Sequence, residues 1–142
     1  MDPQNTNSSG PVRVVGAFES VVFPEFSTEP VIAKIDTGAY TGALHCNMIE
    51  ERHTDSGKVL AFRPFELDTE VVREEFVIKY VRSSNGKREK RYFITTKIKL
   101  QGKQRLISIS LTDRSDMKWQ VLIGRRFLRQ YKYLVDPTVN NG

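Results

Sequence analysis

The chain has 142 residues, of which 39% are hydrophobic and 27% are charged, and its formal net charge is +5. This length fits one domain with a single core, and the sequence has no apolar stretch long enough to cross a membrane as a helix. Cys46 is the only cysteine, which excludes an internal disulfide and fits a reducing compartment, with the cytoplasm as the expected location.

The expected organisation is a disordered leader at 1–11, one domain at 12–137 and a short tail at 138–142. The leader is polar and lacks the basic and apolar regions of a secretion signal. Strands are expected at 12–18, 21–23, 31–35, 42–47, 58–65, 71–82, 92–100 and 107–111. Their alternating apolar positions should form the core. Only 125–131 has helical spacing, so the sequence predicts a mostly β domain with one short C-terminal helix.

Asn85-Gly86 separates two alternating runs, and this dipeptide is the strongest short-range signal for a β-hairpin. Basic residues crowd around the turn, opposed only by Glu89. They are Arg82, Lys87, Arg88, Lys90 and Arg91. Such a patch attracts anionic partners. A solvated turn and contact with an acidic peptide both explain it, whereas nucleic acid is less favoured because no aromatic stacking pattern accompanies the charges.

The segment Asp36-Thr37-Gly38-Ala39 follows the apolar run 31–35, so a carboxylate is expected on a tight turn where a buried strand ends. Gly38 lets backbone amides approach that carboxylate, and Ala39 keeps the next position small. Such a triplet by itself often only closes a loop. A second segment, Leu122-Ile123-Gly124-Arg125, places its glycine 88 positions after the aspartate and leads into the expected helix.

Together these two segments resemble retropepsin-like aspartic proteases. Other segments match a bacterial family of this kind that is labelled an ATP-dependent zinc protease: Ala43-Leu44-His45, Leu111-Thr112-Asp113-Arg114 and Leu134-Val135-Asp136. The resemblance covers roughly 12–137 and implies a closed β-barrel subunit. The chain departs from the family pattern at Tyr40, Gly42 and Trp119-Gln120, which bears on substrate preference more than on the reaction.

Aspartic proteases hold one water between two carboxylates that share a proton, one acting as base and the other as acid. One aspartate is half of such a site, and the chain is too short for two fused lobes. The resemblance therefore implies an aspartic endopeptidase that is active as a homodimer, with Asp36 of each subunit at the twofold axis. Thr37 and Gly38 would position the carboxylates, and Ala39 would contact the substrate.

The resemblance also implies structural support around the turn. Leu122, Ile123 and Gly124 should pack against it, while Arg114 and Arg125 should brace the loops, since arginine pairs well with carboxylates.

A retropepsin covers its bound peptide with a mobile hairpin. The hairpin at Asn85 and Gly86 is the candidate, and Lys87 and Arg88 would then contact the substrate; an ordinary surface hairpin explains the pattern equally well. The family is associated with a ligase that adds glutamates to a ribosomal protein. The resemblance therefore implies trimming of acidic, glutamate-rich tails as a function.

The main alternative to an endopeptidase is a noncatalytic dimeric module that binds acidic protein or nucleic acid. No metal or other cofactor is expected, because His45 and Cys46 are adjacent and point to opposite faces of a strand. The sequence also lacks a Gly-rich phosphate loop. Asp55-Ser56-Gly57 follows a polar segment and is expected to form a hairpin turn instead of a second catalytic turn.

Overall fold

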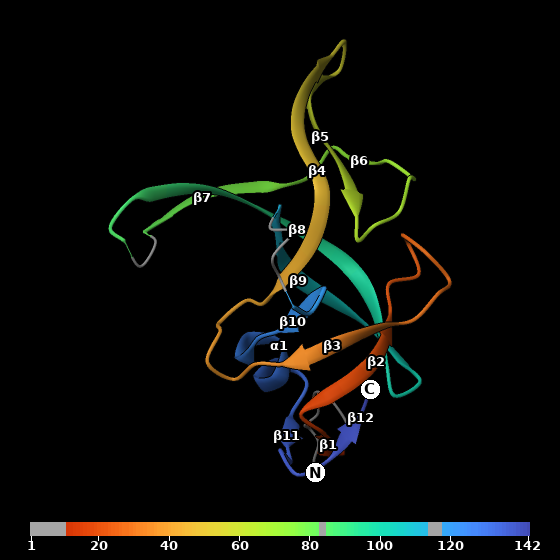
Figure 1. Cartoon of the computed structure of the whole chain (residues 1–142). Helices are drawn as coiled ribbons and strands as arrows, with labels where there is room; N and C mark the ends of the chain where they lie inside the picture. Colours follow the sequence, from red (N-terminus) through yellow and green to blue (C-terminus); the bar gives the residue numbers. More distant parts are fainter. Residues whose placement is uncertain (1–10, 83–84, 114–117) are drawn as a thin grey trace, which may run out of the picture.

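The structure, a computed structural model, describes residues 11–82, 85–113 and 118–142. It is mostly β, and α1 (Arg125–Gln130) is the one helix of the described residues (Figure 1). The strands are β1 (Arg13–Val15), β2 (Phe18–Val22), β3 (Val31–Ile35), β4 (Ala43–Thr54), β5 (Gly57–Pro64), β6 (Val71–Arg73), β7 (Val77–Arg82), β8 (Arg88–Leu100), β9 (Lys103–Thr112), β10 (Val121–Ile123), β11 (Tyr133–Val135) and β12 (Asn140–Asn141). No helix within these ranges has the length and apolar character needed to cross a membrane.

Six strands close into a barrel. Each is hydrogen-bonded to the next in the order β10, β3, β2, β8, β9, β4, and β4 pairs back with β10. The closing strand β10 runs parallel to β3 and antiparallel to β4. The prediction of a mostly β, closed-barrel domain with one short C-terminal helix is confirmed, and the helix ends one residue before its expected end at 131.

The barrel core follows the period of two that the sequence shows. On β8, Ile94, Ile98 and Leu100 point inward, while Lys97 and the other alternate positions from 95 to 99 are exposed. On β9, Ile107 and its i+2 neighbours are buried in the same way. Burial of these aliphatic side chains is the main driving force that closes the barrel.

Two expected strands are each divided in the structure. The run at 71–82 forms β6, which pairs with β5, and β7, which pairs with β8, because the exposed acidic residues Glu74 and Glu75 interrupt its apolar alternation. The run at 12–18 is broken at Gly16, where a Cβ atom would lie 2.4 Å from the carbonyl oxygen of Val139. The chain therefore leaves β1 and enters β2 at a close backbone contact.

Two long hairpins extend from the barrel (Figure 1). In the β4–β5 hairpin, Thr54 pairs with Gly57 around Asp55 and Ser56, which confirms the expected hairpin turn at that triplet. In the β7–β8 hairpin the last pair is Arg82 with Arg88, as the Asn-Gly signal predicts. Positions 83–84 of that turn, and all of the expected leader except Pro11, lie outside the described residues.

The inward and outward positions of the barrel differ in their contribution to stability. Leu100 is fully buried at the end of β8, whereas Leu106 on the paired strand β9 is 54% exposed. Leu100→Ala should lower the free energy of unfolding by about 2–5 kcal/mol, because it removes buried methyl groups and leaves a cavity. Leu106→Ala should cost about 0.5 kcal/mol or less. Equal losses in urea unfolding of the two variants would contradict the assignment of barrel interior and exterior.

Candidate active site

Asp36 is the first residue after β3, and it begins a tight turn. The backbone N–H of Gly38 donates to Asp36 Oδ1 at 3.0 Å, and that of Ala39 donates to the Asp36 carbonyl oxygen at 3.2 Å. A Cβ atom at position 38 would lie only 3.3 Å from Oδ1. The absence of a side chain on Gly38 therefore lets a backbone donor hold the carboxylate, as the sequence indicates.

Strand β10 fixes this turn from the far end of the chain. Leu122 pairs with Lys34 on β3 and with Ala43 on β4, so β10 lies between the two strands that the turn connects. The backbone N–H of Asp36 donates to the carbonyl oxygen of Ile123 at 2.8 Å. The loop 36–42 therefore passes over the end of β10 instead of closing a simple hairpin.

Two glycines allow the loop and β10 to meet. Gly42 has φ +76°, and a Cβ atom there would lie 2.3 Å from the carbonyl oxygen of Leu122. A Cβ atom at Gly124 would lie 2.5 Å from the carbonyl oxygen of Tyr40. The buried hydroxyl of Ser110 donates to the carbonyl oxygen of Gly42 at 2.8 Å. These contacts hold the loop at both ends.

Arg125, at the start of α1, holds the same loop. Its backbone N–H donates to the Ala39 carbonyl oxygen at 2.8 Å, and its guanidinium donates to the carbonyl oxygens of Gly38 at 3.2 Å and Thr37 at 3.4 Å. The guanidinium also lies over the Tyr40 ring, 5.4 Å from its centre. Arg125 thus braces the loop through main-chain carbonyls, whereas pairing with a carboxylate was expected. Arg114, the other expected brace, lies outside the described residues.

The turn places a single carboxylate at the end of the barrel. Asp36 is half-buried and Thr37 is exposed beside it, at the end of the barrel. Asp55, in the other Asp-x-Gly triplet, is exposed at the tip of the β4–β5 hairpin and cannot serve as a second carboxylate beside Asp36. Of these two triplets, only the one at Asp36 lies on the loop that β10 fixes.

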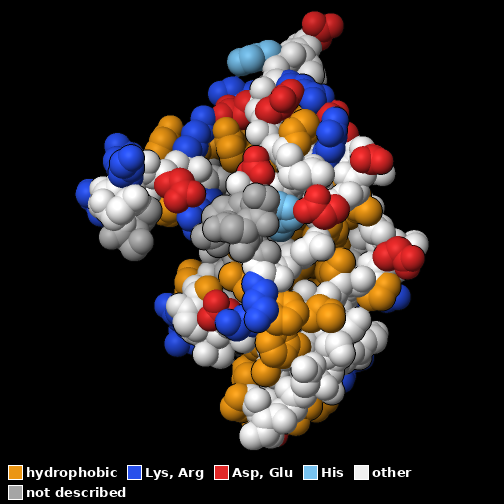
Figure 2. Space-filling model, in the orientation of Figure 1, with side chains coloured by type: hydrophobic (Ala, Val, Ile, Leu, Met, Phe, Trp, Pro, Cys, Tyr) orange, Lys and Arg blue, Asp and Glu red, His pale blue; other side chains and the backbone are white. Residues whose placement is uncertain are grey.

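The residues expected to contact substrate from the hairpin, Asn85, Gly86, Lys87 and Arg88, lie at the tip of β7 and β8. The hairpin and the 36–42 loop both extend to the left of Figure 1, and Figure 2 shows basic side chains gathered at the hairpin tip. The Arg88 guanidinium stacks over the Tyr80 ring at 4.8 Å.

Two members of the basic cluster form ion pairs along the hairpin. Lys90 Nζ lies 2.5 Å from a carboxylate oxygen of Glu51, and Arg91 lies 3.3 Å from Glu89. These carboxylates offset part of the positive charge at the base of the hairpin.

His45 and Cys46 have separate environments. His45 Nε2 lies 3.0 Å from Glu66 Oε1, while Cys46 is buried in the barrel core. Burial, and secondarily the charge of Asp113, raises the pKa of the Cys46 thiol, so it stays protonated and is a poor metal ligand. In the part of the chain that the structure describes, no group of three or more His, Cys, Asp or Glu side chains is arranged to hold a metal ion.

Two residues that shape the site, Gly42 and Ser110, have no role assigned to them from the sequence. A glycine six residues after Asp36 is a sign that the loop needs an unusual backbone conformation there. Its contact with Leu122 has no such sign, because it depends on the position of β10. Ser110 has no local signal, because it reaches the loop only through barrel pairing of β9 with β4.

A six-stranded barrel with one Asp-Thr-Gly turn, held by a Leu-Ile-Gly-Arg segment from the other end of the chain, defines a subunit of the retropepsin-like class. The chain belongs to the RimB-like family, described as retropepsin-like aspartic endopeptidase RimB, whose pattern matches residues 14–141.

Several proteins are similar to most of this chain. A Shewanella pealeana protein named probable alpha-L-glutamate ligase is 30% identical over 131 residues, which cover 88% of this chain and 28% of that protein. A protein of the same name from Parasynechococcus marenigrum is 32% identical over 130 residues, covering 87% of this chain and 28% of that protein. This chain thus spans little more than a quarter of these relatives. The crystal structure of a Legionella pneumophila protein of unknown function matches with a TM-score of 0.72 at 27% identity, covering 91% of this chain and 96% of that one.

The close contact between the loop and β10 can be tested with two matched glycine substitutions. Gly42 and Gly102 have φ values of +76° and +77°, but a Cβ atom at Gly102 meets open space. Gly102→Ala should cost about 1–2 kcal/mol from backbone strain alone. Gly42→Ala should cost about 2 kcal/mol more, because the methyl group collides with the Leu122 carbonyl. Equal losses in chemical denaturation would show that the loop does not depend on this contact.

Proposed function

We propose that this chain is an aspartic endopeptidase that works as a homodimer in the cytoplasm, with one catalytic Asp36 from each subunit. The observation that carries the proposal is the Asp36 carboxylate itself. It accepts a hydrogen bond from the backbone of Gly38 on a loop that β10 and Arg125 hold in place. A carboxylate oriented by main-chain donors on a rigid element is preorganised for chemistry.

In the proposed mechanism, the two Asp36 carboxylates share one proton and bind one water between them. The ionised carboxylate removes a proton from the water as its oxygen attacks the scissile carbonyl carbon, and the protonated one hydrogen-bonds to the developing oxyanion. The carboxyl that took the proton from the water then protonates the amide nitrogen, the C–N bond breaks, and the two peptide products leave. The Gly38 N–H keeps one carboxylate oxygen oriented, and the exposed Thr37 is available to contact the second subunit.

Exposed apolar residues support the pairing of two subunits. β1 and β11 form a separate two-stranded parallel sheet in which Val14 pairs with Leu134, and these side chains are 53% and 59% exposed. A two-stranded sheet with uncovered apolar side chains is marginal by itself. Burying this sheet against its copy in the second subunit would stabilise it.

The proposed substrate is an acidic, glutamate-rich peptide tail. The basic tip of the β7–β8 hairpin would attract such a chain electrostatically. The relatives named probable alpha-L-glutamate ligase supply a second reason, because a domain similar to this chain forms part of proteins whose name refers to joining glutamate. A protease in that setting would shorten what a ligase extends.

Asp36→Asn distinguishes an enzyme from a noncatalytic binding module. The variant keeps the size of the side chain but removes the carboxylate, so hydrolysis of a peptide with an oligoglutamate tail should fall by about 10³-fold. Mass spectrometry of the products measures this, and circular dichroism with peptide binding checks that the fold and affinity remain. Unchanged cleavage by Asp36→Asn would eliminate the mechanism, whereas binding without cleavage by the wild type would favour the module.

The acidic preference can be tested by reversing charge at the hairpin tip. Replacing Lys87 and Arg88 with Glu should lower kcat/KM for an acidic peptide about 10- to 100-fold relative to a neutral one, because the tip would then repel the substrate. Replacing the exposed Lys99 and Lys103 with Glu makes the same charge change at the β8–β9 turn and serves as the control. The preference is refuted if the tip variant keeps the wild type's ratio of kcat/KM for the acidic peptide to that for the neutral one.

A further inference from the structure

The β7–β8 hairpin leaves the barrel at a defined point. Pairing of β8 with β9 runs from Leu100 opposite Lys103 to Tyr92 opposite Leu111. The remaining residues of β8, from 88 to 91, pair only with β7. At Tyr92, β8 therefore stops pairing with β9 and continues paired with β7 alone. The angle between the hairpin and the barrel can change at this position.

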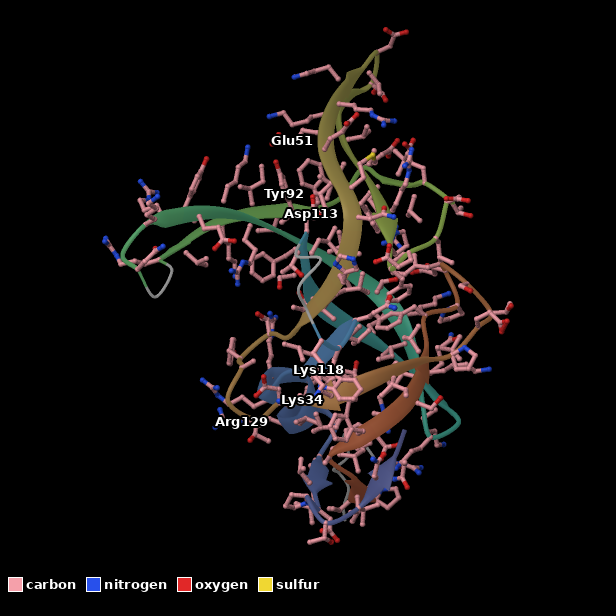
Figure 3. The ribbon with its side chains drawn as sticks, viewed as in Figure 1. Lys34, Glu51, Tyr92, Asp113, Lys118 and Arg129 are labelled. Atoms are coloured by element: carbon pink, nitrogen blue, oxygen red, sulfur yellow. The ribbon has the colours of Figure 1, made fainter. Side chains whose placement is uncertain are left out.

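A carboxylate from another hairpin contacts this point. Glu51 belongs to the part of β4 that pairs with β5 beyond the barrel. Its Oε2 atom accepts from the Tyr92 hydroxyl and from Lys90 Nζ, each at 2.5 Å, and its Oε1 atom lies 3.2 Å from Lys58 Nζ. Figure 3 shows Glu51 and Tyr92 near each other, above the barrel.

The surroundings make these contacts more than a surface ion pair. The Glu51 side chain is 18% exposed, beside the more exposed side chains of Lys90 and Lys58. Lys90 Nζ also lies 5.5 Å from the centre of the Tyr92 ring, and the Phe76 ring lies 6.2 Å from that of Tyr92. The base of the hairpin is thus held by one carboxylate and one aromatic contact.

We infer that Glu51 is a positioning residue that latches the base of the β7–β8 hairpin to the β4–β5 hairpin and so sets how far the hairpin tip moves over the candidate active site. Glu51 does not contact the 36–42 loop and takes no part in the chemistry. It acts through its contacts with Lys90 and Tyr92, which lie on β8 at the base of the hairpin. This inference rests on the proposed function for its effect on catalysis, but not for its effect on hairpin motion.

The Glu51 carboxylate stays ionised in mild acid. The hydrogen bonds from Lys90 and then Tyr92 lower the pKa of the Glu51 carboxyl to about 2. Because this folded-state pKa is below its ordinary value, the contribution of the ionised group to stability is complete above the ordinary pKa, declines as the pH falls below it and is lost by about pH 2. An aspartic protease working in mild acid would therefore retain the latch.

Hydrogen exchange with Glu51→Gln tests the inference directly. The substitution preserves shape and removes the charge, so exchange of the amides in 77–82 and 88–91 should become about 10-fold faster, since hydrogen bonds to charged groups are the strong ones. Glu50→Gln is the matched control, because Glu50 is the preceding residue and pairs with Arg52 instead. The inference is overturned if exchange is unchanged in Glu51→Gln, or if Glu50→Gln gives the same increase.

Two further measurements complete the test. One asks whether Glu51 and Tyr92 act through the same contact, and the other separates the hairpin contact from the proposed protease activity. Tyr92→Phe removes one donor, and adding it to Glu51→Gln should produce little further increase in exchange if both act through one contact. In peptide hydrolysis, Glu51→Gln should raise KM roughly 3- to 10-fold while kcat changes less, because the covering conformation is less populated. If the wild type cleaves no peptide but the exchange results hold, the latch stands and the proposed function fails.

Discussion

The insertion of β10 between β3 and β4 is the constraint on which the rest of the structure depends. It closes the barrel and brings residues 87 positions apart in sequence into direct contact, with the Asp36 N–H bonded to the Ile123 carbonyl. Gly42 and Gly124 are required for the same reason, because a side chain at either would overlap the backbone of the other segment. The position of the carboxylate is thus a consequence of how the barrel closes.

This arrangement explains why one chain carries a rigid but incomplete site. Contacts within its own chain orient Asp36, from the N–H of Gly38 and the carbonyl of Ile123. In the proposed dimer, the second carboxylate comes from the partner subunit. Pairing two preorganised loops costs less conformational entropy than ordering them on association. The base of the β7–β8 hairpin is likewise held in the peptide-free chain, by the contacts of Glu51 with Lys90 and Tyr92.

Much of the fold could be predicted from the sequence because its signals are local. Alternating apolar residues identify β8 and β9, Asn85-Gly86 identifies a hairpin, and the Asp36 and Gly124 segments identify the family. The contacts that complete the site could not be predicted in this way. Ser110 and Glu51 reach their partners through strand register set by the whole barrel, and neither lies in a pattern that distinguishes it from an ordinary strand residue.

The central claim is that two copies of this chain place their Asp36 carboxylates around one water. A crystal structure of the protein with a non-hydrolysable acidic peptide tests it most directly. The account predicts a twofold dimer in which the two carboxylates lie about 3 Å apart and share a water facing the peptide. A peptide-bound complex in which the two Asp36 side chains are separated and face solvent independently would contradict it.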